Sequence, residues 1–158
     1  SSARIKLNLR WFSENTRNIL LQGIEKINEG LAVANDLPRD MYPKIEMRGN
    51  AYPLINDTIL SRKINASLAT VVSTEKILVN TPPIMGSEDF YHLGKRNPLV
   101  IYDYLFVGTA NAAKAAEAQK EGKTYPFFLH TGNYEVDLSA ITLGTEIGAN
   151  ALLAIFKK

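Results

Sequence analysis

The stretch RIKLNLRW, residues 4–11, decides the fold that the sequence predicts. Its apolar and polar residues alternate, which is typical of a β-strand with one buried and one solvated face. Residues 13–34 follow with apolar positions three and four apart, so we expect an amphipathic helix that Ser13 caps. Residues 44–52 alternate again. Strand, helix and strand together predict a β-α-β unit, and hence a protein of the α/β class.

The rest of the chain fits the same class. Asn56 or Asp57 can cap a helix that carries Ile64 and Leu68, and the boundary between two parts is expected near residues 53–57. Further stretches are strand-like: residues 71–72 and 76–79, residues 99–107 and residues 125–130. An alanine-rich stretch, residues 109–121, predicts a surface helix or mobile insertion with little chemistry of its own. Asp137 would cap a final helix, whose expected inward residues are Ile141, Ile147, Ala151, Leu152 and Ile155.

Composition excludes several classes of protein. The 158 residues include 18 Lys and Arg against 16 Asp and Glu, and a net charge of +2 does not favour a nucleic-acid or membrane-surface binder. No cysteine is present, so disulfides, thiolate nucleophiles and cysteine metal sites are excluded. The apolar runs are shorter than the roughly 20 residues of a membrane span, and no membrane partner is expected.

His130 is the first candidate for chemistry. It ends an apolar strand-like stretch, and the ends of strands are where open α/β sheets bind ligands. One imidazole cannot make a zinc site, which needs three or four ligands. A structural histidine is the alternative, and for His92 a packed or surface histidine is the better interpretation.

Two further candidates carry charge. Glu88 and Asp89 could bind a metal or share a proton, or they could cap a short helix. Arg10 lies on the polar face of the first stretch, where a solvated side chain is the ordinary outcome. Its guanidinium could instead hold a substrate carboxylate through two hydrogen bonds.

Two sequence motifs occur in an order that resembles a known protein family. The loop Met85-Gly86-Ser87-Glu88-Asp89-Phe90 precedes His130-Thr131-Gly132-Asn133-Tyr134-Glu135-Val136 by some forty residues, and Leu143-Gly144 follows in the last helix. This order resembles the C-terminal part of the zinc-dependent aminoacylase, hippurate hydrolase and glutamate carboxypeptidase family. Residues 5–10 and the helix after them are similar to the second half of that family's dimerisation lid.

The resemblance implies a fold and two domains. Residues 1–55 would be the second half of a ferredoxin-like β-α-β lid, and residues 56–158 the C-terminal part of an α/β/α catalytic domain. The start of the chain within a strand pattern suggests a piece of a longer protein. The family's other metal ligands and its general base would lie upstream of these residues, so no catalytic residue is assigned and the chain alone is expected to be inactive.

The resemblance also implies site residues. His130 would be the last protein ligand of a two-metal zinc site, with manganese or cobalt as alternatives. Arg10 would meet the substrate carboxylate, and Gly86, Ser87 and Glu88 would line the pocket. The implied protein is a homodimer that hydrolyses amide bonds of N-acyl amino acids or small peptides. One departure is the missing proline two residues after the histidine, where this chain has Gly132.

Two other functions stay open at this stage. The chain could be a stand-alone dimerisation or binding module without catalysis. It could also be a small nucleic-acid binder that uses Arg4, Lys6 and Arg10, against which the near-neutral charge and the missing stacking aromatics weigh.

Overall fold

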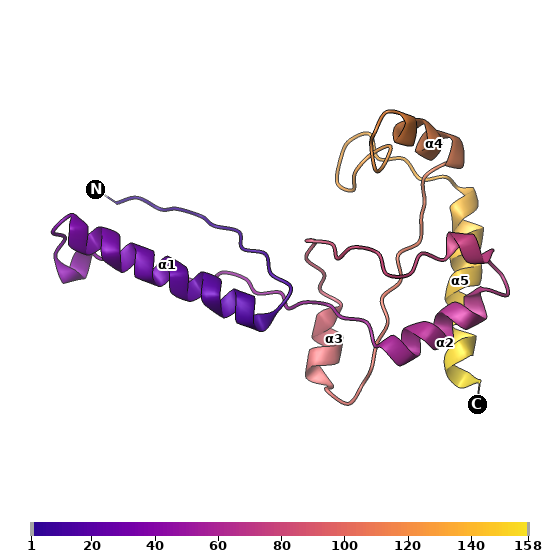
Figure 1. The fold of residues 1–158 in the computed structure, drawn as a ribbon, viewed down its shortest axis with the longest axis horizontal. Coiled ribbons are helices and arrows are strands. Elements are labelled where there is room, and N and C mark those ends of the chain that lie inside the picture. Colours follow the sequence, from indigo (N-terminus) through magenta and orange to yellow (C-terminus); the bar gives the residue numbers. More distant parts are fainter. Residues whose placement is uncertain (1, 158) are drawn as a thin grey trace. The chain divides into compact units, whose positions relative to one another are not determined.

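A computed structural model describes residues 2–157, and every regular element in that range is a helix (Figure 1). In chain order these elements are α1 (Glu14–Ala34), the 3₁₀ turn η1 (Arg39–Met41), α2 (Thr58–Leu68), the 3₁₀ turn η2 (Thr74–Lys76), α3 (Tyr91–Arg96), α4 (Ala112–Lys120) and α5 (Ser139–Phe156). The expected α/β fold, an α/β/α catalytic domain with half of a β-α-β lid, is therefore wrong for the part of the chain that the structure describes.

The prediction fails because a β-strand is stable only when its backbone forms hydrogen bonds with a neighbouring strand. Residues 2–11, 44–55 and 101–108 run without helix, but no backbone ladder joins any of them to a second segment within residues 2–157. Ile5, expected on the buried face, is 84% exposed. Alternation is a local property of the sequence, whereas a sheet requires distant backbone groups to pair, and here that pairing is missing.

The chain divides into two compact units. The first comprises the residues up to Ile55 together with Pro82–Val100, and the second comprises Asn56–Thr81 together with the residues from Ile101 onward. The assignment of residues 1–55 to a lid and of residues 56–158 to a catalytic domain stays a prediction.

Helix α1 is the main element of the first unit. Ser13 caps it as expected, because its Oγ accepts a hydrogen bond from the Thr16 amide at 3.1 Å. The expected apolar stripe is only partly covered: Leu20 and Ile24 are half-buried, whereas Ile27 is 62% exposed. Little apolar surface thus holds this unit together.

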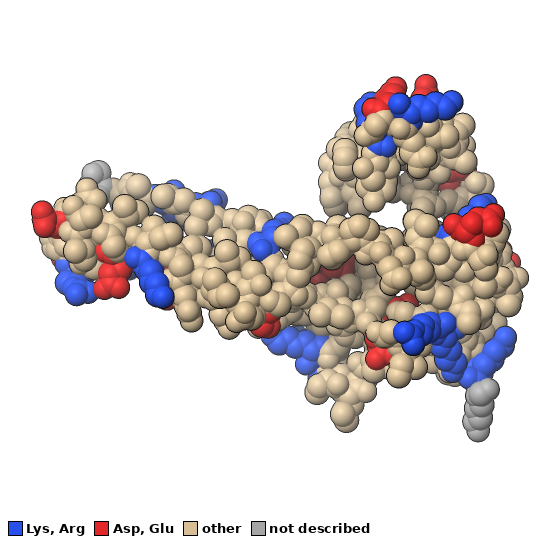
Figure 2. Space-filling model, in the orientation of Figure 1, with Lys and Arg blue, Asp and Glu red and all other residues tan. Residues whose placement is uncertain are grey.

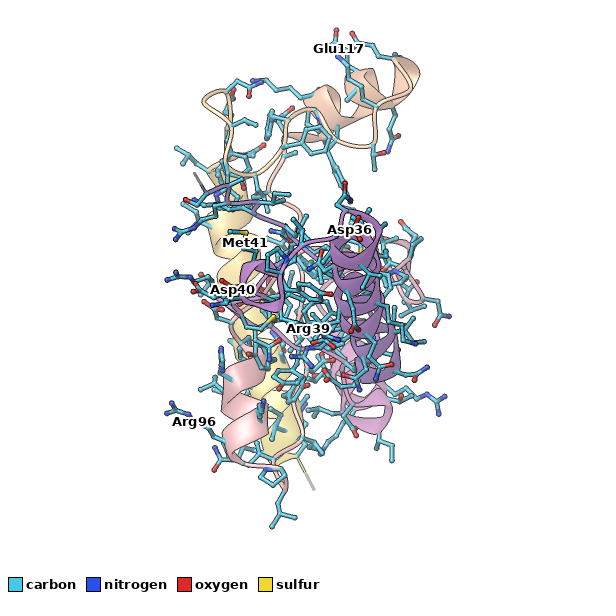
Figure 3. All side chains as sticks on the ribbon, turned by 90° about the vertical axis from the view of Figure 1, so that its left-hand side faces the viewer. Asp36, Arg39, Asp40, Met41, Arg96 and Glu117 are labelled. Atoms are coloured by element: carbon cyan, nitrogen blue, oxygen red, sulfur yellow. The ribbon has the colours of Figure 1, made fainter. Side chains whose placement is uncertain are left out.

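The turn η1 follows α1 and returns toward it. The Arg39 guanidinium, labelled in Figure 3, lies 3.6 Å from the Glu29 carboxylate and 5.0 Å from the centroid of the Tyr42 ring. Both groups of the ion pair are exposed, so the pair contributes little to stability, typically about 0–1 kcal/mol.

Helices α2 and α5 pack against each other and form the core of the second unit. Asp57 caps α2 as expected, accepting a hydrogen bond from the Leu60 amide at 2.8 Å. Ile64, Leu68 and Ala154 are the buried residues of this core. Partly buried apolar residues surround them: Leu60, Val71, Ile77, Ile147 and Ala151.

In the second unit, the Asn56 side chain forms hydrogen bonds with an extended backbone segment that pairs with no strand among the described residues. The Asn56 amide group donates to the Tyr104 carbonyl at 3.0 Å and accepts from the Tyr104 amide at 2.9 Å. Beside it, the Ser61 hydroxyl of α2 donates to an Asp103 carboxylate oxygen. These contacts fix the extended residues 101–104 to the start of α2.

Helix α5 is mostly apolar, apart from a few polar residues such as Thr142, Glu146 and Asn150. Ile147 and Ala151 lie toward the core as expected, but Ile141, Leu152 and Ile155 are exposed, so the expected inward face is wrong at these three positions. By length and composition the helix could cross a membrane, since its 18 residues have a mean hydropathy of 1.4. A single helix of this kind is a weak indication, because core helices of globular proteins meet the same criteria.

Candidate functional site

Arg10 and Ser87 lie together in the first unit. A terminal nitrogen of the Arg10 guanidinium, Nη1, donates a hydrogen bond to the Ser87 Oγ, although the two residues are 77 positions apart. Both side chains are exposed. The structure therefore joins two of the four residues expected to bind substrate. A guanidinium beside a hydroxyl presents several hydrogen-bond donors to an anion such as a carboxylate.

The loop that carries Ser87 leads directly into α3. The Glu88 carboxylate accepts a hydrogen bond from the Phe90 amide at 3.1 Å, and the Asp89 carbonyl accepts one from the His92 amide at 3.0 Å. Glu88 thus bonds to the amide of Phe90, the N-cap residue of α3, but among the described residues no side chain caps α3 itself. The expected helix cap by these acidic residues is therefore wrong. At Gly86 an added Cβ would meet only the Ile84 side chain, at 3.7 Å, so the loop does not need glycine there for space.

An aromatic cluster fixes α3 to residues 50–52. The Tyr91 side chain, 3% exposed, donates from its hydroxyl to the Asn50 carbonyl at 2.9 Å. Its ring lies 5.4 Å from the Tyr52 ring, and the Lys95 ammonium lies 3.4 Å from the Tyr52 centroid. Sequence reasoning missed this cluster because its members are separated along the chain and show no common spacing.

Hydrogen bonds and charge at this cluster change the pKa of one side chain, Tyr52. The pKa of the Tyr52 phenol is lower than its usual value of 10.0, because the Lys95 side chain and then Asn50 hydrogen-bond to it, and the Lys95 charge favours the phenolate. His92 stacks on Tyr91 with ring centroids 4.0 Å apart. His92 is exposed, as for the packed or surface histidine that the sequence favoured.

His130 lies in the second unit, in a tight turn. Its φ of 64° is in the left-handed region, which a non-glycine residue adopts only at a cost. The Thr131 hydroxyl donates to the Phe128 carbonyl at 2.7 Å, and the Tyr134 amide donates to the Thr131 carbonyl at 3.1 Å. The imidazole is exposed and makes no hydrogen bond or ion pair with any residue between 2 and 157.

The described residues do not fit a complete metal site. Among residues 2–157, no group of three or more His, Cys, Asp or Glu side chains comes close enough to hold an ion. Zinc needs at least three protein ligands, and His130 offers one nitrogen. By itself this part of the chain does not form the two-metal centre that the resemblance implies.

The loop that follows His130 is joined to the region of α4, to which the sequence assigned no chemistry. The Asp137 amide donates to the Thr109 carbonyl at 2.8 Å, and the Asn111 side chain donates to the Asp137 carboxylate at 2.8 Å. Lys114 forms an ion pair of 2.6 Å with Glu135. The alanine-rich composition of residues 109–121 gives no indication of these polar contacts, although basic and acidic side chains gather over α4 (Figure 2).

Asp137 is the most perturbed carboxyl group of this loop. Hydrogen bonds from Ser139 and then from Asn111 hold the pKa of Asp137 below its ordinary value of 3.8. A carboxyl group with a depressed pKa stabilises the fold above the pKa of the unfolded chain, and this contribution disappears as the pH falls through the folded pKa.

We therefore expect acid to release this loop. Hydrogen exchange at the Asp137 amide should keep its protection from neutral pH down to about pH 4 and lose it at lower pH, after correction for the intrinsic exchange rate. An Asp137→Asn variant lacks the titrating group and should lose this dependence. Equal acid dependence in both proteins would show that another group controls the loop.

Comparison with known proteins relates the chain to a class of peptidases. The chain is similar in part to thermostable carboxypeptidases. No family model matches the chain. No solved structure matches it either.

Two curated relatives carry this similarity, both from the archaeon Saccharolobus solfataricus. Thermostable carboxypeptidase 2 is 29% identical over 112 residues, which cover 71% of this chain and 24% of the relative. Thermostable carboxypeptidase 1 is 34% identical over 103 residues, which cover 65% of this chain and 20% of the relative. The matched part of the chain thus spans a quarter or less of the length of these relatives.

Proposed function

We propose that the chain is part of a metal-dependent hydrolase of the carboxypeptidase type, which cleaves amide bonds of N-acyl amino acids or small peptides. The observation that carries this proposal is the contact of Arg10 with Ser87 in a chain that is similar to thermostable carboxypeptidases. The substrate of a carboxypeptidase ends in a free carboxylate, and the two side chains together can bind that group.

The chemistry of the pair supports a role in binding. A guanidinium donates through a planar fork that matches the two oxygens of a carboxylate, and charge-assisted hydrogen bonds of this kind are stronger than neutral ones. Arg10 and Ser87 now bond to each other, so a carboxylate could accept from the Arg10 fork and from the Ser87 hydroxyl at the same place. Glu88 supports the loop through the Phe90 amide.

His130 is proposed as one metal ligand of the hydrolase, with zinc as the first choice and manganese or cobalt as alternatives. Its exposed imidazole and left-handed backbone support this role. The remaining ligands and a general base have no counterpart among the described residues, so we expect no turnover from these 158 residues alone.

The proposal is tested by titrating the labelled chain with N-acetylglycine and with N-acetylglycinamide. The acid should shift the NMR signals of Ser87 and of the Arg10 guanidinium, while the amide, which has no carboxylate, should leave them unchanged. Replacing Arg10 with Gln should weaken binding of the acid about tenfold, because a charge-assisted hydrogen bond is lost. In the hydrolase, the same change should raise KM for carboxylate substrates more than it lowers kcat.

Arg4→Gln is the matched control, because Arg4 is an exposed arginine of the same extended segment and forms no hydrogen bond with Ser87. This variant should bind N-acetylglycine like the unmodified chain. Equal shifts with the acid and the amide, or equal weakening by the two arginine variants, would remove Arg10 and Ser87 from the substrate site.

A further inference from the structure

We infer that Thr109, Asn111 and Lys114 are positioning residues for His130, acting through residues 134–137. This inference rests on the proposed function, because His130 is the group that is positioned. We name the three residues the α4 clamp, since they lie immediately before α4 or in its first turn. Their contacts with residues 134–137 join α4 to the loop that ends at α5.

Four contacts make up the clamp. Two of them come from Thr109: its carbonyl accepts from the Asp137 amide at 2.8 Å, and its hydroxyl lies 3.1 Å from the Tyr134 hydroxyl. The Asn111 side chain donates to the Asp137 carboxylate at 2.8 Å. The Lys114 ammonium lies 2.6 Å from the Glu135 carboxylate. Three residues of one short segment thus meet three of the four residues 134–137.

Asp137 and Asn111 each form hydrogen bonds both with each other and with the start of a helix, so their contact is the centre of the clamp. One carboxylate oxygen of Asp137 accepts from Asn111, and the other accepts from the amide and hydroxyl of Ser139 at the start of α5. Asn111 is the N-cap of α4, because its side-chain oxygen accepts from the Ala113 amide at 3.0 Å. A single hydrogen bond therefore connects the first turns of two helices.

The loop depends on these polar contacts because apolar burial gives it little support. Phe128 and Leu129, which directly precede His130, are 65% and 64% exposed. The left-handed backbone of His130 has a conformational cost and persists only when its surroundings hold it. Tyr134 connects the turn to the clamp, since its amide bonds to Thr131 and its hydroxyl meets Thr109.

An exchange of Asn and Asp tests the central contact in the complete chain. Asn111→Asp keeps a good helix cap for α4 but removes the donor and places two carboxylates together. Amide exchange at Tyr134 and Asp137 should accelerate about tenfold, and the left-handed signature of His130 in its NMR coupling and Cα shift should disappear. The circular dichroism of the helices should stay unchanged.

The double variant Asn111→Asp with Asp137→Asn restores the hydrogen bond with its donor and acceptor exchanged. Both measurements should return to within about twofold of the original chain. A role limited to general stability predicts that the two changes add instead of cancelling. The inference is overturned if Asn111→Asp leaves the loop unchanged, or if the double variant is no better than the single one.

The ion pair gives a second and independent test. Lys114→Glu and Glu135→Lys should each loosen the loop by a few-fold, as expected for an exposed pair, and the double exchange should restore it. Lys114→Glu adds an acidic residue near the N-terminus of α4, where it favours the helix, so loosening cannot come from loss of α4. Glu117→Lys is the control, because Glu117 of α4 points away from the loop (Figure 3).

Failure of the inference and failure of the proposed function give different results. If the exchanges loosen and restore the loop but His130→Ala leaves the hydrolase fully active, the clamp is supported as a device that fixes the loop and the metal role of His130 is wrong. If His130→Ala removes activity while Asn111→Asp changes neither the loop nor KM and kcat, the clamp is overturned and the proposed function stands.

Discussion

Replacing Leu68 with alanine is expected to lower the free energy of unfolding of the second unit by about 3 kcal/mol. Leu68 is 5% exposed and packs with Ile64 and Ala154 between α2 and α5. The loss combines the apolar burial that the leucine side chain supplies with the cost of the cavity left between the two helices. A loss of this size is a large fraction of the stability of a small domain, about 5–15 kcal/mol.

Urea unfolding followed by circular dichroism measures this effect. Ile59→Ala is the matched control, since Ile59 lies on the same helix and is 77% exposed. Its replacement should change stability by less than about 0.5 kcal/mol. Equal effects of the two variants would mean that α2 and α5 do not pack through Leu68 in solution.

Replacing His130 with alanine is expected to reduce hydrolysis by more than about a hundredfold, because even groups that only support metal ligands account for losses up to that size. The measurement is turnover of N-acyl amino acids by the hydrolase that contains this chain. The fold should stay intact, because the imidazole is exposed and makes no hydrogen bond or ion pair with another described residue.

His92→Ala is the control for this second prediction. His92 stacks on Tyr91, so its loss should affect local packing but leave turnover within a few-fold. A His130 variant that unfolds while it retains metal would identify His130 as a structural residue. Equal activity losses in the two variants would contradict a specific metal role for His130.

Local signals in the sequence predict the caps of α1 and α2, whereas α3 and α5 begin without the expected side-chain caps among residues 2–157. Ser13 and Asp57 each bond to an amide three residues ahead, so the pattern that identifies them is contained within one turn. The length of α1 also follows from its own residues, since the predicted range 13–34 matches Glu14–Ala34. The strands could not be predicted in this way, because alternation such as that of residues 4–11 does not supply the second segment that a ladder requires.

For the candidate site too, the sequence identifies single residues but not the contacts between distant ones. Arg10 and Ser87 could be singled out by chemistry and by resemblance, but their contact depends on how the chain folds over 77 positions. Asn111 could not be found from its surroundings, since an asparagine before a run of alanines indicates only a helix cap. Its bond to Asp137, 26 positions away, appears only in the structure.

The exposed apolar side chains of α5 have a practical consequence for handling the protein. Ile141, Leu152 and Phe156 meet water directly, so their hydration depends strongly on the solvent. Sulfate or phosphate at high concentration would drive copies of the chain together, since excluded salts strengthen apolar association. A mild detergent would cover these side chains and keep the chains apart during purification.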